Sequence, residues 1–240
     1  MQVITSKDNE IVKEIKKLKE KKYRDQNNKY IVEGIKLVKE AIEEKAKISK
    51  IVICEDCIND GSIEQNLMYE IAKYDCIGVS EKVFSTLTDV TTPQGLLAVI
   101  EKNTSEDISY NEDIILVLDG IQDPGNLGTI LRTADSVNLK QIIVTKATAD
   151  VYNPKVVRST MGAIFRINVI EVDNLVTTLK EIKKNKYKIV ATSLCAEENI
   201  YQTLEVIYNN DQYINIENIK KYLDYEDIKK ANISLNLIQE

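Results

Sequence analysis

Two apolar runs joined by an amphipathic helix constrain the fold of this chain more than any other feature. Residues 114–118 (IILVL) and 141–145 (QIIVT) are short and apolar, and residues 126–137 between them repeat apolar side chains at helical spacing. A continuous apolar run is typical of a central strand that a parallel sheet buries on both faces. The sequence therefore predicts an α/β fold with a strand–helix–strand unit near its centre.

A similar alternation of short strands and helices extends along most of the chain. Helices are predicted over residues 8–22, 34–44, 63–74 and 81–87, and strands over residues 30–32, 50–54, 77–79 and 96–100. After the central unit, the pattern predicts a loop and helix over 151–163, strands over 165–170 and 187–192, and a helix over 175–184. Such alternation favours a mainly parallel sheet with helices on its faces.

A polar segment interrupts this alternation once. Residues 103–111 (NTSEDISYN) contain almost no apolar side chain and are typical of a linker. We therefore expect two domains, residues 1–102 and 113–240, joined by a linker over residues 103–112.

Composition excludes several classes of protein. The chain has 240 residues, 43% apolar and 29% charged, as expected of a soluble globular protein. It contains no run of 18 apolar residues, and its first 22 residues lack the apolar core of a secretory signal. We therefore expect a cytoplasmic protein without a membrane partner. The absence of histidine removes Ser-His-Asp and Cys-His catalysis and the commonest general base.

The four cysteines leave two interpretations open. Cys54 and Cys57 form a single CxxC pair, and a zinc site would need Cys76 and Cys195 to converge on it. In the alternative, which we favour, these residues are small hydrophobic side chains in a reducing compartment. No metal is expected.

Charge is distributed unevenly along the chain. The net charge is −6, but residues 1–50 hold 14 Lys and Arg against 9 Asp and Glu, while residues 191–240 hold 4 against 9. A basic arm on an acidic protein indicates a polyanionic partner. A solvated helix face explains the same pattern equally well. If the partner is a polyanion, the cations expected to bind it include Lys17, Lys21, Lys22 and Arg24.

The segment DPGNLG over residues 123–128 precedes the central helix and is the first candidate site. A turn that leads into a helix N-terminus presents backbone amides to an anion. Asn126 and Arg132 add polar groups to this region, but six helical residues rotate by about 600°, so the two converge only if Asn126 lies in a loop ahead of the helix. Otherwise they are an N-capping Asn and a surface Arg.

A second polar segment, residues 153–163 (NPKVVRSTMGA), places Arg158 and Ser159 ahead of Gly162 and Ala163. Small residues allow either a ligand or a neighbouring backbone to approach closely. The pattern is therefore compatible with a binding site and with tight helix packing.

Together these segments resemble the SpoU/TrmH family of RNA ribose 2′-O-methyltransferases. Residues 123–135 (DPGNLGTILRTAD) look like the first motif of that family, and residues 153–167 (NPKVVRSTMGAIFRI) look like the second. Residues 1–100 also resemble its small substrate-binding domain, through the lysine-rich first helix, YIVEGIKLVKEA and TTPQGLLAVI. The resemblance covers about 195 residues in order.

The resemblance implies transfer of a methyl group from S-adenosylmethionine to a ribose 2′-hydroxyl of ribosomal or transfer RNA by a homodimer. It implies a parallel-sheet domain of the SPOUT type, closed by a trefoil knot, after a small α/β RNA-binding domain. It assigns catalysis to Asn126 and Arg132 and RNA binding to Arg158, Ser159 and the basic N-terminal residues. The positions that correspond to cofactor contacts are Thr192, Ser193 and Gly162.

After about residue 201 the sequence departs from the family pattern. The expected glycine-rich loop is absent, because Gly162 is the last glycine, and Ser234-Leu235-Asn236 matches the final motif only briefly. Either the knot and cofactor pocket are incomplete and the protein is a catalytically silent RNA-binding protein, or the tail supplies a pocket with other residues. A third alternative is an unrelated nucleotide-binding α/β protein, although no GxGxxG or GxxxxGK[ST] pattern is present.

Overall fold

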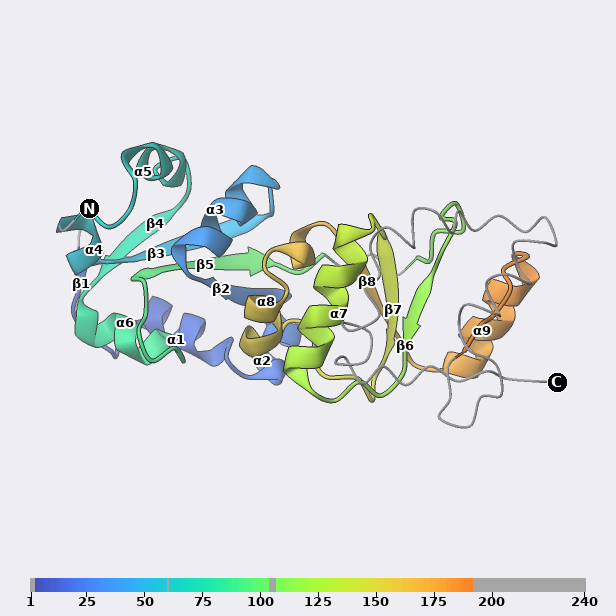
Figure 1. Cartoon of the computed structure of the whole chain (residues 1–240). Helices are drawn as coiled ribbons and strands as arrows, with labels where there is room; N and C mark the ends of the chain where they lie inside the picture. The colour runs from blue at the N-terminus through green and yellow to red at the C-terminus, as the bar shows by residue number, and fades with distance from the viewer. Residues whose placement is uncertain (1–2, 60, 104–106, 192–240) are drawn as a thin grey trace. The chain divides into compact units, whose positions relative to one another are not determined.

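The computed structural model describes residues 3–59, 61–103 and 107–191. The chain forms two compact units (Figure 1). The first unit comprises residues 1–104 and 150–166, and the second comprises residues 105–149 and 167–240. The segment 150–166 therefore belongs to the first unit although it follows a strand of the second.

The first unit contains a five-stranded sheet in the order β1-β4-β3-β5-β2. Its strands are β1 (Val3–Ile4), β2 (Lys29–Glu33), β3 (Ile48–Cys54), β4 (Cys76–Val79) and β5 (Leu96–Glu101). Strand β5 is antiparallel to both β3 and β2, and the other neighbours pair in parallel. The expectation of a mainly parallel sheet holds only in part, because two of the four neighbouring strand pairs are parallel and β5, inserted between β3 and β2, is antiparallel to both.

Helices cover both faces of this sheet. They are α1 (Glu10–Lys17), α2 (Lys21–Asn27), α3 (Ile35–Glu43), α4 (Glu55–Asn59), α5 (Gln65–Ile71) and α6 (Glu81–Leu87). In Figure 1, α3 and α5 lie on one face, and α1 and α6 lie on the other. Val12 and Ile15 of α1 pack with Val83 and Phe84 of α6 in an apolar core cluster.

The single helix predicted over residues 8–22 is wrong, because the structure divides it. Helix α1 ends at Lys17, and α2 begins at Lys21. Leu18 turns into the apolar core at the break. The break also releases the carbonyl groups of Leu18 and Lys19, which accept hydrogen bonds from the Arg24 side chain.

The segment 150–166 adds a short helix to the first unit. Helix α8 (Pro154–Ser159) packs against β2, and a 3₁₀ turn, η1 (Ala163–Phe165), follows it. Asn153 caps α8 through its side chain, which accepts from the Lys155 backbone N–H at 2.9 Å. Val156 and Val157 are buried, so α8 is anchored by an apolar face.

The second unit contains three parallel strands, β6 (Leu116–Leu118), β7 (Gln141–Thr145) and β8 (Asn168–Val172). Helices α7 (Pro124–Ser136) and α9 (Leu175–Lys184) cover opposite faces of this sheet (Figure 1). On the α9 side, Ile143 and Ile170 pack against Ile182. These parallel strands confirm the predicted α/β class.

Two strand predictions in this unit need correction. The strand expected over residues 165–170 begins at Asn168, because η1 and the turn after it extend to Arg166. Residues 187–191 form no strand, and Thr192 lies outside the described residues. Tyr187 instead packs against Tyr110, and its hydroxyl donates to the carbonyl of Glu112. Among the described residues, no helix is long and apolar enough to cross a membrane.

Candidate functional site

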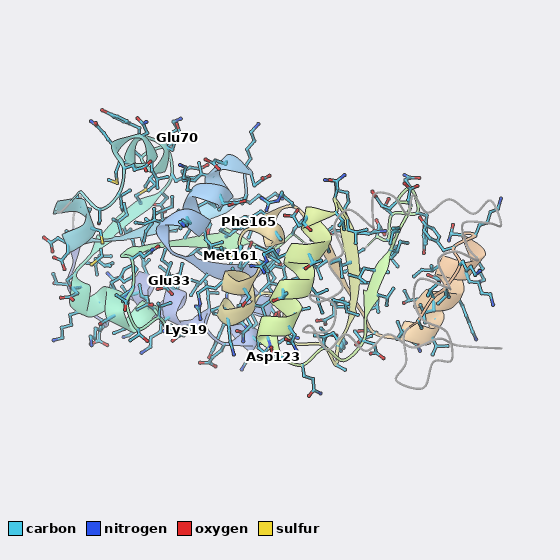
Figure 2. All side chains as sticks on the ribbon, in the orientation of Figure 1. Lys19, Glu33, Glu70, Asp123, Met161 and Phe165 are labelled. Carbon is cyan, nitrogen blue, oxygen red and sulfur yellow. The ribbon has the colours of Figure 1, made fainter. Side chains whose placement is uncertain are left out.

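The helix of the first motif starts earlier than expected. Asp123 is the N-cap of α7, its carboxylate accepts from the Asn126 backbone N–H at 2.8 Å, and Pro124 occupies the first helical position (Figure 2). Asn126 therefore lies within the first helical turn, so the condition under which it would converge with Arg132, a place in a loop ahead of the helix, is not met. The aspartate caps the helix, so the Asn126 side chain is not needed as a cap.

Arg132 lies on the same helix, six residues after Asn126, so the two side chains are about 120° apart around the helix axis. Arg132 is exposed, and the opposite face of α7 is buried through Leu127, Ile130 and Leu131. Within the described ranges, no hydrogen bond or ion pair engages the Arg132 guanidinium. Helix α7 thus presents the Arg132 guanidinium to solvent, and its buried face holds the backbone in place.

The carboxyl ends of β6 and β7 carry a polar network that the sequence patterns did not reveal. The Thr145 hydroxyl donates to the Asp119 carboxylate at 2.8 Å and accepts from the Gly120 N–H at 3.3 Å. Thr148 donates to the carbonyl of Leu118 at 3.3 Å. This edge of a parallel sheet is where ligands usually bind. The sequence feature that could have indicated this network is Asp119, a carboxylate directly after a predicted buried strand.

The segment of the second motif is fixed to the first unit at its start by a buried ion pair. Arg24 is 2% exposed, and its guanidinium donates to the Asp150 carboxylate and to the carbonyls of Leu18 and Lys19. All three nitrogens of the guanidinium are engaged. Arg24, expected to bind a phosphate, therefore has a packing role, because burial and these acceptors leave it unavailable to RNA.

Next to this pair, two tyrosines pack against each other. The rings of Tyr30 and Tyr152 lie 4.8 Å apart, and the Tyr152 hydroxyl donates to the carbonyl of Asn103 at 3.2 Å. Burial, assisted by the charge of Asp150, raises the pKa of Tyr152 to about 12. Burial likewise raises the pKa of Tyr30. Both hydroxyls therefore stay neutral at physiological pH, and this cluster is structural.

Arg158 of α8 faces a shallow pocket of the first unit. Its Nη1 atom is 4.0 Å from Oε2 of Glu33, whose other oxygen accepts from the Thr88 hydroxyl. Lys19 and Asp89 also line this pocket and form an ion pair at 2.8 Å. Glu33 and Lys19 lie on the same side of the first unit (Figure 2). The Glu33 carboxylate is buried, and the Arg158 side chain that faces it remains 33% exposed.

The end of the same segment is also packed tightly. Gly162 has φ +98°, and a Cβ built on it would lie 2.6 Å from Cδ of Glu40. Glu40 and Glu44 both pair with Arg166. The space beside Gly162, expected to serve the cofactor, is therefore filled by Glu40. Ser159 also bonds internally, because its hydroxyl donates to the Lys155 carbonyl at 2.8 Å.

The three lysines expected to contact RNA lie at the α1–α2 junction and are exposed. The ammonium groups of Lys17 and Lys22 lie 5.5 and 5.8 Å from the centre of the Tyr23 ring. Lys21 is at the first position of α2. The junction therefore places two cations at one aromatic ring, with a third lysine exposed beside them in the sequence.

The remaining expected contacts, Thr192 and Ser193 for the cofactor, lie outside the described residues. The loops expected to form a knot and the divergent tail from about residue 201 lie outside them as well. In the part of the chain that is described, no group of three or more Cys, Asp or Glu is arranged to hold a metal ion. Cys54, Cys57 and Cys76 are free thiols.

Comparison with known families matches both units. The MRM3-like substrate binding domain matches residues 9–98, and the SpoU rRNA Methylase family matches residues 113–218. The second match extends beyond residue 201, where the motif pattern is lost.

Among known proteins, the chain is 34% identical over 194 residues to the 23S rRNA (guanosine(2553)-2′-O)-methyltransferase RlmP of Bacillus subtilis, covering 81% of this chain and 74% of that protein. It is also 33% identical to the mitochondrial rRNA methyltransferase 3 of Xenopus tropicalis. That alignment covers 63% of this chain but only 37% of the longer relative.

A solved rRNA methyltransferase from Sinorhizobium meliloti has the same fold, with a TM-score of 0.70, 31% identity, and coverage of 84% of this chain and 76% of that one. The structure of this rRNA methyltransferase with AdoMet bound matches with a TM-score of 0.64 and 31% identity, over 81% and 73% of the two chains.

Proposed function

The chain belongs to the SpoU rRNA methylase family, and from that premise we propose that it methylates a ribose 2′-hydroxyl of RNA with S-adenosylmethionine as methyl donor. Ribosomal RNA is the proposed substrate class, because the Bacillus subtilis relative acts on 23S rRNA. The observation that carries the proposal is Arg132, an exposed cation that the described structure leaves unpaired on a helix anchored by its opposite face.

Arg132 is proposed to act on the ribose oxygen. A 2′-hydroxyl must lose its proton as it attacks the methyl carbon, so negative charge develops on that oxygen. A guanidinium is cationic at any physiological pH and presents several donors in a plane. We therefore assign Arg132 the stabilisation of the developing alkoxide. A phosphate of the RNA is the proposed acceptor of the proton.

Asn126 is proposed to orient the ribose. Its position in the first turn of α7, on a different side of the helix from Arg132, favours a contact with substrate over a contact with Arg132. The Asn126 side chain offers both a donor and an acceptor, which suits a sugar hydroxyl.

RNA phosphates are proposed to bind the exposed lysines of the α1–α2 junction, Lys17, Lys21 and Lys22, and the half-buried Arg158, beside Ser159. Binding of this kind weakens steeply as salt rises, because counterions are released from the nucleic acid. The half-buried Tyr23 ring, approached by Lys17 and Lys22, is proposed to offer an aromatic contact to an unpaired base.

S-adenosylmethionine supplies an electrophilic methyl group when bound, and Thr192 and Ser193 are the proposed contacts on this chain. The carboxyl edge of β6 and β7, with the Asp119–Thr145 pair, offers polar groups and a glycine that suit a nearby ligand. Gly162 is proposed to serve packing, since Glu40 fills the space beside it.

The organisation of the protein follows from the same premise. We propose an RNA-binding domain over residues 1–102, a linker over 103–112 and a catalytic domain over 113–240. A cytoplasmic homodimer is proposed by analogy within the family. Light scattering of the purified chain measures the dimer directly.

One observation favours a second candidate, a catalytically silent RNA-binding protein. No glycine occurs after Gly162, so a glycine-rich cofactor loop is absent from residues 163–240. The two candidates share RNA binding and differ in binding of S-adenosylmethionine.

Methyl transfer from isotopically labelled S-adenosylmethionine to ribosomal RNA tests the function directly. We expect labelled 2′-O-methyl nucleosides after digestion and saturable cofactor binding in calorimetry. Absence of calorimetric binding at millimolar cofactor, together with retained binding of RNA, would reject the enzyme in favour of the silent protein. Cofactor binding without transfer to ribosomal RNA would instead direct the test to transfer RNA.

A further inference from the structure

Two cysteines border the same small space at the end of β3. Cys54 is the last residue of β3, and Cys57 follows three residues later, within α4. Cys54 is 4% exposed, and Cys57 is half-buried. The pair lies in the first unit and has no part in the proposed methyl transfer.

Gly95 makes room for both thiols. It has φ +69°, and a Cβ built on it would lie 2.0 Å from Cys57 Sγ and 3.0 Å from Cys54 Cβ. The Cys57 Cβ would be 3.1 Å from the same point. The β-carbons of Cys54 and Cys57 therefore both face the backbone of Gly95, and a side chain at this position would lie between them.

Backbone hydrogen bonds hold this arrangement in place. The Cys54 N–H donates to the Gly95 carbonyl at 2.7 Å, and the Cys57 thiol donates to the Gln94 carbonyl at 3.4 Å. Because both β-carbons lie about 3 Å from the same point beside Gly95, they are no more than about 6 Å apart. A disulfide requires about 3.5–4.5 Å, so closure needs an approach of at most roughly 2 Å.

We propose that Cys54 and Cys57 form a reversible disulfide by exchange with a low-molecular-weight disulfide, so that the β3–α4 junction is a redox modification site. The accessible Cys57 thiolate attacks one sulfur of the small disulfide, forms a mixed disulfide and releases one small thiolate. The Cys54 thiolate then attacks Cys57 Sγ and releases the second. The protein loses two electrons and two protons, and the small disulfide becomes two thiols.

The environment of the pair determines this order of attack. Burial raises the pKa of the Cys54 thiol, and the neighbouring Cys57 sulfur and the carboxylates of Asp56 and Glu81 raise it further, although a hydrogen bond from the Asp56 backbone opposes them. The raised pKa lowers the thiolate fraction of Cys54, so the more accessible Cys57 is placed to attack first and the Cys54 step is expected to limit closure. Closure is expected to accelerate as pH rises, because both steps need thiolate.

The test is a redox titration of the full chain in mixtures of reduced and oxidised glutathione, with acid quenching, alkylation and mass spectrometry. Trypsin releases residues 51–73 with Cys54 and Cys57 together, and residues 74–82 with Cys76 alone. We expect the first peptide to lose two hydrogens and both alkylation sites, and to regain them with reductant. Alkylation of both cysteines in excess oxidised glutathione, or linkage to Cys76 or Cys195, would overturn the proposal.

Matched serine variants separate this pair from the other thiols. Cys57→Ser should abolish the internal linkage and leave at most a mixed disulfide. Cys76→Ser is the control, because the Cys76 thiol donates to the Ile71 carbonyl at 3.0 Å, away from this pair. Loss of closure in Cys76→Ser, or its survival in Cys57→Ser, would contradict the assignment. The wild-type peptide result stands independently of how the variants fold.

Discussion

The helix of the first motif and the segment of the second hold their polar side chains in opposite ways. In α7, Arg132 is exposed and unpaired among the described residues, while the helix beneath it is firmly packed. In residues 150–166, the two arginines meet carboxylates of the first unit: Arg158 faces Glu33, and Arg166 pairs with Glu40. Asp150 in turn receives the buried Arg24.

The difference separates groups that are ready for a ligand from groups that hold the fold. A buried ion pair satisfies both partners, so neither is free to bind substrate without breaking the other's interaction. An exposed, unpaired arginine costs little folding free energy, because water solvates it. Most of its interaction energy is therefore gained when a ligand binds. The first motif therefore carries the proposed chemistry, and most of the second attaches this segment to the substrate-binding sheet.

The largest effect is expected from Arg24→Ala. Removing one partner of a buried pair leaves the Asp150 carboxylate uncompensated and should lower the free energy of unfolding by about 3–5 kcal/mol. Denaturant unfolding measures this value. Lys13→Ala, which breaks an exposed pair with Asp8, is the control and should cost less than about 1 kcal/mol. Equal effects of the two variants would mean that burial of Arg24 does not anchor the segment.

Arg132→Ala should remove activity and leave stability nearly unchanged. Loss of one group that stabilises a developing oxyanion lowers the rate by roughly 100- to 1,000-fold. The measurement is single-turnover methyl transfer, with RNA affinity and thermal unfolding as parallel readouts. Thr133→Ala, at the next exposed position of α7, is the matched control. Full turnover in Arg132→Ala would remove the distinction drawn between the two motifs.

Gly162→Ala tests whether the second motif is a packing element. A side chain at φ +98° is strained, at a cost of about 1–2 kcal/mol, and the contact with Glu40 adds to that cost. We expect lower stability with unchanged affinity for S-adenosylmethionine in calorimetry under native conditions. A large loss of cofactor affinity in a fully folded variant would restore Gly162 to the cofactor site. Gly125→Ala, at a helical glycine, is a useful comparison.

Much of the fold could be predicted from local patterns, whereas the roles of the polar residues could not. The residue ranges predicted for β7 and α9 from apolar periodicity match the observed ones, because this signal depends only on neighbouring residues. Arg24 looked like one more cation of a basic helix end, yet its partner Asp150 lies 126 residues later in the chain. No spacing rule connects positions so far apart.

The start of α7 shows a signal that was present but given too little weight. Asp123 followed by Pro124 is a favoured N-cap and first-turn pair, and it places the helix start before Asn126. The apolar periodicity placed the helix start at Asn126, and the capping residues place it two positions earlier. The antiparallel direction of β5 was also beyond local patterns, because an apolar run carries no information on strand direction.

The smallest effect concerns the lysines of the α1–α2 junction, which extend the comparison to a third region where cations are exposed. Lys17→Ala and Lys22→Ala should each weaken RNA binding modestly and lower the slope of log affinity against log salt by about 1. Fluorescence anisotropy at several salt concentrations measures that slope. Lys73→Ala, whose lysine pairs with Glu70 on α5, is the control and should leave it unchanged. If all three variants behave alike, the junction is only a solvated helix face, and phosphate binding falls to Arg158.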